Sequence, residues 1–187
     1  MYQRISGVIG ITINMKKLFF IGTLHAGITP NKELAQILKT LKPDQLLVEI
    51  HQKDVVNNYL KNYPVEMVFA LRWAKRNKIQ VKGFAHHIDM LAKGKTQKDN
   101  LVVIQEQKKV IKKYFWHDFN KEKYTKLLNT KNFKPLIDQK AWKQCEEAMA
   151  RNIKKYQSKK GVSVVLCGVG HLSFFEKKFK QAIFPLR

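Results

Sequence analysis

Short apolar runs alternate along this chain with segments whose apolar positions recur every three or four residues. The runs have the length of buried strands and are rich in β-branched side chains. They cover residues 17–21, 45–50, 79–84 and 162–167. Strands separated by helices of this length are joined by parallel crossover connections. The pattern therefore predicts an α/β fold with a mainly parallel central sheet and helices on both faces.

The helical segments also carry start signals. Thr29 and Pro30 predict a helix with Thr29 as its cap and Pro30 in its first turn, followed by leucines at helical spacing. Pro135 is predicted to begin the last long helix, which presents one apolar stripe. On that helix Asn152 falls inside the stripe, and Arg151 falls at its flank.

The chain length fits a single domain of residues 1–187. Residues 90–130 are charged and aromatic with loosely helical spacing, which predicts a helical insertion, either packed over one side of the sheet or forming a lid. Two interpretations of residues 1–14 stay open, an additional edge strand or a segment upstream of an alternative start at Met15.

The formal net charge of +22 favours contact with a polyanion such as nucleic acid, or with an acidic partner. Lysines interleaved with aromatic residues, as in Lys112-Lys113-Tyr114-Phe115-Trp116, are compatible with base stacking and equally with core packing. Only five of the 36 basic residues are arginine, the better phosphate-recognition residue. A biased composition therefore explains the charge better than dedicated nucleic-acid binding.

The cysteines and the N-terminal region bear on location. Cys145 and Cys167 lie in apolar surroundings far apart in sequence, which is not typical of a secreted disulfide scaffold. The apolar run of residues 8–13 is much shorter than the ~20 residues that a membrane span needs. A reducing, cytoplasmic location is expected.

Two strands end in the same motif, Gly-x-x-His. The first strand runs into Gly22 and His25, and the last runs into Gly168 and His171. The second strand ends in Glu49, a carboxylate that is costly to bury unless it is paired or bound to a cation. Gathered at the carboxyl edge of the sheet, His25, Glu49 and His171 would suit a divalent metal such as zinc, manganese or cobalt. Without a metal, a histidine oriented by Glu49 would serve as a general base.

Other residues are candidates for substrate or oxyanion contacts at the same edge. The glycines permit close backbone approach, and nearby N–H groups could stabilise an oxyanion. The candidates are Gly22, Thr23, Gly168, Gly170, Asn152 and His86. His86 and His87 follow the third strand and would point to opposite sides, so at most one of them faces the site.

These motifs and their order resemble the TraB/PrgY/GumN superfamily, which includes TIKI-type metalloproteases and is more distantly similar to erythromycin-esterase-like and ChaN-like proteins. The matching segments are Phe20-Ile21-Gly22-Thr23-Leu24-His25, Lys42-Pro43-Asp44 with Leu47-Val48-Glu49, Glu147-Ala148-Met149-Ala150-Arg151-Asn152-Ile153, and the closing Gly-x-x-His-Leu. The resemblance implies an α/β metal-dependent hydrolase with His25, Glu49 and His171 at its site. Members of the family carry an arginine on the late helix, one turn before the position of Met149, and this chain has Cys145 there. Arg151 is the candidate catalytic replacement, but only after a shift of register.

The leading hypothesis is a metal-dependent hydrolase of a peptide, amide or ester bond. The alternative is a non-catalytic binding protein of the same fold that contacts nucleic acid or an acidic partner through its basic surface. In a third interpretation the histidines are only structural.

Overall fold

The computed structural model describes residues 16–25, 27–86 and 90–187, so the two interpretations of residues 1–14 and the orientation of His87 lie outside the described residues. Within this part of the chain, strands β1 (Lys17–Thr23), β2 (Gln45–Val48), β3 (Gln80–Gly83) and β4 (Val162–Gly168) form one sheet. Their order is β1-β4-β2-β3, and every neighbouring pair is parallel. The predicted parallel α/β fold is confirmed.

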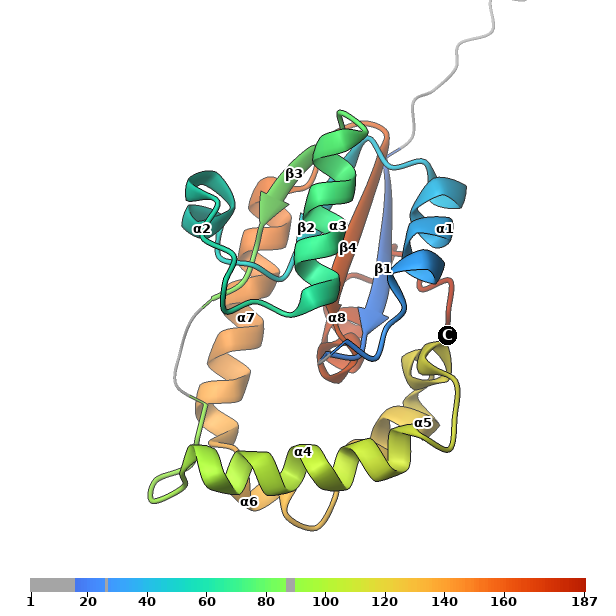
Figure 1. The fold of residues 1–187 in the computed structure, drawn as a ribbon. Coiled ribbons are helices and arrows are strands. Elements are labelled where there is room, and N and C mark those ends of the chain that lie inside the picture. The colour runs from blue at the N-terminus through green and yellow to red at the C-terminus, as the bar shows by residue number, and fades with distance from the viewer. Residues whose placement is uncertain (1–15, 26, 87–89) are drawn as a thin grey trace, which may run out of the picture.

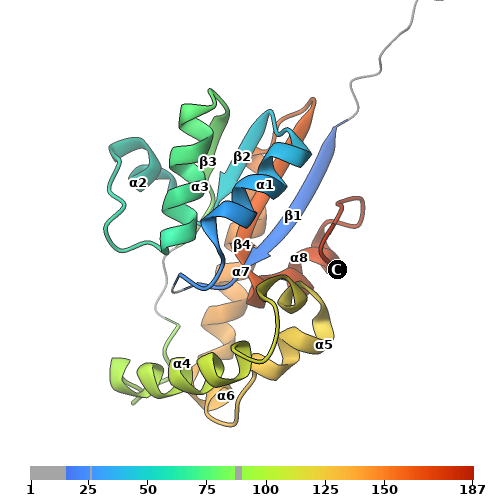
Figure 2. The ribbon, with the colours of Figure 1, turned by 45° about the vertical axis from the view of Figure 1, so that its right-hand side comes forward.

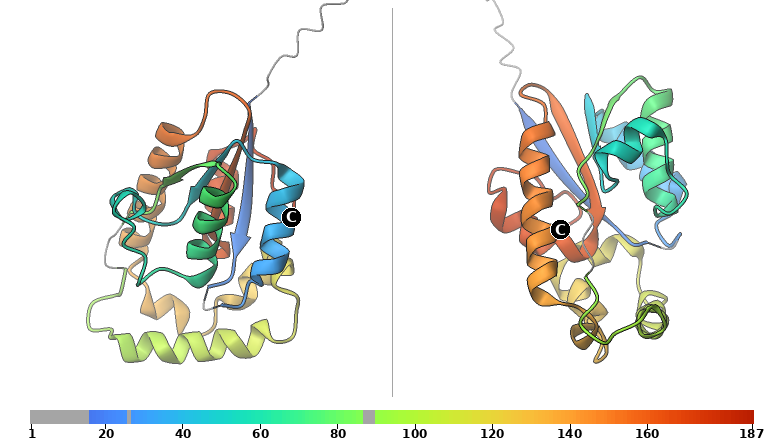
Figure 3. Two further views of the ribbon diagram at one scale, coloured as in Figure 1. Left: turned by 45° about the horizontal axis from the view of Figure 1, so that its top comes forward. Right: turned by 90° about the vertical axis from the view of Figure 1, so that its left-hand side faces the viewer.

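Helices cover both faces of the sheet (Figures 1 and 3). Helices α1 (Asn31–Leu41) and α3 (Val65–Arg76) lie on one face, with α2 (Gln52–Asn57) beside β3. Helices α7 (Gln139–Tyr156) and α8 (Leu172–Lys178) lie on the other. This double cover explains why the inner strands β4 and β2 are largely apolar instead of alternating, whereas the edge strand β3 is partly exposed.

Strand β4 shows how successive side chains supply the two cores. Val164 and Leu166 pack with the cluster beneath α1 and α3. Val165 and Cys167 point the other way, into the cluster beneath α7 and α8. Because side chains alternate across a strand, one buried strand stabilises both layers.

Two predicted helix starts are wrong. Helix α1 begins at Asn31 with Pro30 as its cap residue, and the Thr29 hydroxyl instead accepts from the Leu24 N–H at 2.8 Å, closing the loop after β1. Pro135 lies in the short helix α6 (Phe133–Leu136), and the long helix α7 is capped by Asp138. The carboxylate of Asp138 accepts hydrogen bonds from two backbone N–H groups of the first turn, which is a better cap than proline can offer.

The predicted insertion is helical and lies across the carboxyl ends of the strands (Figures 1 and 2). Its elements are α4 (Gln97–Ile111), the 3-10 helix η1 (Trp116–Asn120), α5 (Glu122–Thr125) and the 3-10 helix η2 (Lys126–Leu128), and α6 follows directly after it. Trp116 and Phe119 are buried, and the Trp116 indole N–H donates to Glu33 at 2.7 Å. These two aromatic side chains pack inward and are not available for stacking on bases.

Asn120 anchors this insertion to the sheet. Its side-chain oxygen accepts from the Gly22 N–H at 2.7 Å, and its side-chain amide donates to the Gly22 carbonyl at 3.0 Å. Further along the same edge of β1, Ile183 exchanges backbone hydrogen bonds with Leu18 and Phe20. The free edge of β1 is thus paired by other parts of the chain.

The cysteines are as predicted, because Cys145 and Cys167 are both buried free thiols. Burial, with the nearby charges of Glu49 and Glu146, raises the pKa of the Cys145 thiol to about 11. None of the helices in the described ranges combines the length and the apolar character needed to cross a membrane.

The Asn120 anchor can be tested by Asn120→Ala. The substitution leaves the buried N–H and C=O of Gly22 without partners, so the free energy of unfolding should fall by about 1–3 kcal/mol in urea denaturation. Asn129→Ala, at an exposed position whose side chain makes no hydrogen bond to the described residues, is the matched control and should stay within about 0.5 kcal/mol of the unmodified protein. Equal stability of the two variants would contradict the anchoring role.

Candidate active site

The three residues predicted to share a site come from three neighbouring strands. His25 follows β1, His171 follows β4 and Glu49 follows β2, and β4 lies between the other two. Parallel strands bring their carboxyl ends to one edge of the sheet, where α/β folds place their ligands. His171 Nε2 lies 3.6 Å from Glu49 Oε1.

Gly168 lets these groups approach one another. Its backbone N–H donates to Glu49 Oε2 at 2.6 Å. A β-carbon at this position would lie 2.9 Å from His25 Nε2 and 3.7 Å from Glu49 Oε2. The glycine of the second motif is therefore needed because its missing side chain leaves room for the first histidine.

A buried carboxylate holds each histidine from behind, and sequence reasoning missed both. Glu66 of α3 lies 2.6 Å from His25 Nδ1, and Glu146 of α7 lies 3.0 Å from His171 Nδ1. The side chain of Glu66 is fully buried, and that of Glu146 is 9% exposed. With each Nδ1 hydrogen-bonded to a carboxylate, each Nε2 is left to face the cluster.

Helical spacing carried a signal for these glutamates. Glu146 lies three, four and seven residues before the buried Met149, Ala150 and Ile153, so it shares their face of α7. Glu66 likewise lies on the face of α3 that buries Ala70. A glutamate within an apolar stripe needs a partner inside the protein.

The cluster concentrates negative charge in a basic protein. Three of the 14 acidic residues of the chain, Glu49, Glu66 and Glu146, surround two imidazoles. Even with both imidazoles protonated, the cluster keeps a charge of −1. The other carboxylate oxygen of Glu66, Oε2, is buried and has no hydrogen-bond partner among the described residues. The charge and the unpaired oxygen both favour a cation.

The pKa values reflect this coupling. Burial by itself would raise the pKa of Glu49, but the charges of His171 and His25 and the N–H of Gly168 lower it to about 2. Burial by itself would lower the pKa of His171, but Glu49 and Glu146 raise it to about 9. The pKa of His25 is also raised, since Glu66 and Glu49 outweigh the effect of burial.

A cavity of about 630 Å³ opens above the cluster, and His25, Glu49 and His171 line it. His25 is the accessible member, with 43% of its side chain exposed, whereas His171 is 7% exposed. The indole of Trp142 stacks on the His171 ring with a centroid distance of 4.7 Å. The cavity therefore gives a ligand access to His25 while His171 stays covered.

The remaining predicted contacts separate into two groups. Thr23, Gly168 and Gly170 line the cavity, although the N–H of Gly168 is already used by Glu49. Gly22 lies outside the cavity lining, and its N–H is bound to Asn120. Two of the backbone N–H groups predicted to contact an oxyanion, those of Gly22 and Gly168, are thus already hydrogen-bonded within the protein.

Three other predicted residues lie away from the cluster. Arg151 is exposed and lines a surface hollow with Glu147, away from the cluster. The side-chain amide of Asn152 donates to the Phe84 carbonyl at 3.1 Å, tying α7 to the segment after β3. His86 has an exposed side chain, and its carbonyl accepts from the Cys145 thiol at 3.3 Å.

Within residues 16–25, 27–86 and 90–187, no group of three His, Cys, Asp or Glu side chains is arranged to hold a metal ion as it stands. A scan of protein-family models, a search of curated proteins and a search of solved structures each found no match to this chain. The resemblance to the TraB/PrgY/GumN superfamily therefore stays a prediction.

The coupling of His171 to its two carboxylates predicts a pH-dependent stability. The pKa of His171 is about 9 in the folded protein and near 6.5 when unfolded, so its contribution is complete below pH 6.5 and is lost as the pH rises through 9. The pKa of Glu49 is about 2, so its contribution is complete above pH 4.5 and is lost toward pH 2. In EDTA, His171→Gln should therefore be most destabilising near pH 5.5.

Urea denaturation at pH 5.5 and pH 9.5 measures this effect. The difference in unfolding free energy between the unmodified protein and His171→Gln should shrink by on the order of 2 kcal/mol at the higher pH. His117→Gln, on η1 outside the cluster, is the control and should show no such change. A destabilisation by His171→Gln that is the same at both pH values would contradict the coupling.

Proposed function

We propose that His25, Glu49 and His171 bind a divalent cation, zinc, manganese or cobalt, and that the protein hydrolyses a peptide, amide or ester bond. The observation that carries the proposal is the pair of buried carboxylates on the two Nδ1 atoms. Histidines that bind metals commonly donate their other ring N–H to a carboxylate, which fixes the ring and strengthens the ligand.

The residues present fit a metal in their chemistry. Two imidazole nitrogens and one carboxylate are a common ligand set for these ions, and leave positions open for water and substrate. The negative charge of the cluster and the unpaired oxygen of Glu66 favour a cation at this place. When bound, the cation would polarise a substrate carbonyl and lower the pKa of a water molecule.

The protein's own residues would organise the rest of the reaction. The exposed face of His25 meets the cavity, so the reacting carbonyl would be placed beside that ring. Trp142 covers His171 and excludes water from one side of it, while the Gly168 N–H keeps the Glu49 carboxylate in one orientation. Each group is fixed before the substrate arrives, which lowers the cost of reorganisation.

The position that corresponds to the arginine of the TraB/PrgY/GumN superfamily is occupied by the neutral side chain of Cys145 in this chain. The Cys145 thiol has a raised pKa and donates to a backbone carbonyl, so it supplies no positive charge. Arg151 is exposed on the far side of α7 and cannot replace it. Positive charge for a substrate would have to come from the lysines that line the cavity, Lys108, Lys126 and Lys134.

Metal binding is the direct test. Calorimetric titration of the metal-free protein with zinc, manganese and cobalt should show one site. His25→Ala and His171→Ala should each weaken binding at least about 100-fold, and Glu66→Gln and Glu146→Gln about 10- to 100-fold, because the glutamates act through the histidines. Hydrolysis of 4-nitrophenyl acetate should require the same metal, and its rate should fall in each variant whose metal binding is weakened.

His117→Ala is the matched control, since it removes a histidine outside the cluster and should leave affinity and hydrolysis unchanged. Metal binding that is absent, or that survives both His25→Ala and His171→Ala, would exclude the proposed site. Hydrolysis that persists in EDTA and needs His25 would instead support the metal-free mechanism with a general base.

A second candidate function is supported by a groove elsewhere on the surface. A hollow of about 740 Å³ lies along α3, and its lining includes Lys61, Arg72, Lys75 and Arg76. None of the cluster residues lines it. Four basic side chains beside one groove would attract a nucleic-acid backbone or an acidic partner.

Electrophoretic shift of a short DNA or RNA tests this second function. Affinity should fall steeply with salt, and Arg72→Glu with Arg76→Glu should weaken binding about tenfold or more and lower the salt slope by about 2. Lys109→Glu with Lys131→Glu, which reverses the same charge outside the groove, is the control. Indifference to both nucleic acid and salt would remove this candidate.

A further inference from the structure

We propose that the cavity above the cluster is an acyl pocket, and that the substrate joins an apolar acyl group to an anionic leaving portion through an ester or amide bond. This inference rests on the proposed hydrolase function and specifies its substrate class. It is carried by three features of the cavity, which are its walls, its rim and the exposure of its floor.

The walls are apolar and come from separate parts of the chain. They include Ile28 after β1, Ile104 and Ile111 of α4, Leu128 of η2, Phe133 of α6 and Ile137 before α7. A volume of about 630 Å³ lies within the range of pockets for small organic ligands. Aliphatic and aromatic walls of this kind favour an apolar group of several carbons over a polar one.

Three wall residues have no role in the core. Ile104, Phe133 and Ile137 are half-buried, and they pack against neither of the two core clusters of the described residues. The ring of Phe133 meets Trp142 edge-on at 6.3 Å, so it extends the apolar surface toward His171. These side chains would gain burial from a ligand and not from the fold, which points to an apolar occupant.

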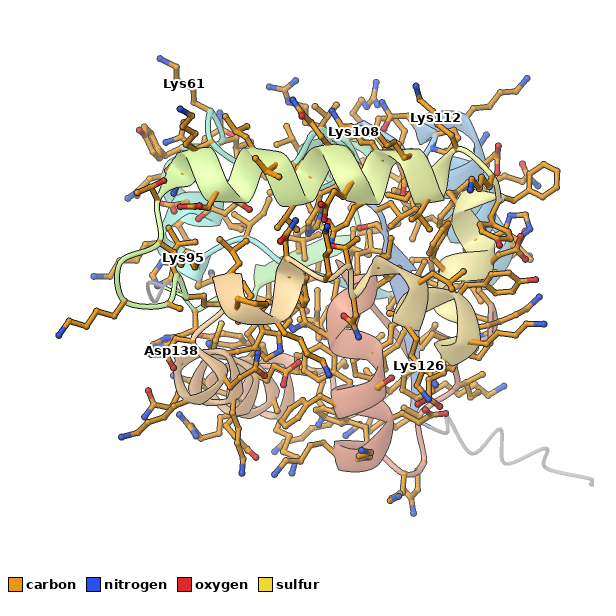
Figure 4. The ribbon with its side chains drawn as sticks, turned by 90° about the horizontal axis from the view of Figure 1, so that it is seen from below. Lys61, Lys95, Lys108, Lys112, Lys126 and Asp138 are labelled. Carbon is orange, nitrogen blue, oxygen red and sulfur yellow. The ribbon has the colours of Figure 1, made fainter. Side chains whose placement is uncertain are left out.

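The rim carries an excess of positive charge. Lys108, Lys126 and Lys134 line the opening, and Glu122 is the one carboxylate among the described lining residues outside the cluster. Glu122 pairs with Lys126 at 3.0 Å, which leaves Lys108 and Lys134 to act on a ligand. Seen from below, Lys108 on α4 and Lys126 lie on opposite sides of this region (Figure 4). Such a rim attracts an anion.

The floor determines how a substrate would lie. His25 is the exposed member of the cluster, so the reacting carbonyl would sit at the floor, with the acyl group between the walls and the anionic portion at the rim. In the reaction, the oxygen of water adds to the carbonyl carbon and the bond to the leaving group breaks. One proton of the water goes to the leaving group and the other to solvent, and the acyl group leaves as a carboxylate.

A pair of esters of different chain length tests the walls in the metal-loaded protein. After correction for spontaneous hydrolysis, kcat/KM for 4-nitrophenyl octanoate should exceed that for 4-nitrophenyl acetate by about tenfold or more. Ile104→Glu should abolish this preference. Leu101→Glu, an exposed position on the same helix outside the cavity, should retain it. Equal kcat/KM values for the two esters in the unmodified protein would overturn the acyl pocket.

A second pair tests the rim. 3-Carboxy-4-nitrophenyl octanoate adds an anion to the leaving group, and its kcat/KM relative to 4-nitrophenyl octanoate should fall about tenfold or more in Lys108→Glu with Lys134→Glu. The control, Lys109→Glu with Lys131→Glu, changes the net charge equally outside the cavity. The same ratio in both double variants would overturn the anionic portion.

Binding of octanoate to the metal-free protein, followed by calorimetry, separates this inference from the hydrolase function. Octanoate binding that Ile104→Glu weakens, with no hydrolysis of any ester, would retain the pocket and reject the hydrolase. Hydrolysis that is insensitive to chain length, with no octanoate binding, would retain the hydrolase and reject the pocket. Circular dichroism of each variant confirms that it is folded.

Discussion

The largely buried carboxylate of Glu49 is the group around which the carboxyl edge of the sheet is built. It directly follows a strand that is covered on both faces, and a charge there is costly unless other groups compensate it. His171 Nε2 approaches one oxygen, and the Gly168 N–H donates to the other. Gly168 ends β4 and His171 follows it, so the pairing of β2 with β4 and the ionisation of Glu49 stabilise each other.

The sheet order extends this constraint to the rest of the fold. Because β4 lies between β1 and β2, the two Gly-x-x-His turns meet with Glu49 beside them. Helices on opposite faces then each contribute a glutamate, Glu66 from α3 and Glu146 from α7. Both helical layers are therefore coupled to one site, and the insertion across the strand ends encloses the cavity above it.

Much of this arrangement could be predicted from the sequence because it is local. Apolar runs and helical spacing identified the strands and most helices, and a parallel sheet places the residues after β1, β2 and β4 at one edge. The helix starts at Thr29 and Pro135 were wrong, because Thr29 bonds within the preceding loop and Asp138 caps α7 better. Glu66 and Glu146 were missed since their histidine partners lie 41 and 25 residues away. Arg151 lies outside because the face of α7 is set by tertiary packing.

Diffraction from crystals soaked in zinc, recorded on both sides of the zinc absorption edge, tests the central claim most directly. The account predicts one anomalous peak at about 2.0–2.2 Å from His25 Nε2, His171 Nε2 and a carboxylate oxygen of Glu49. A peak elsewhere in the molecule, or no peak with the cluster intact, would contradict it.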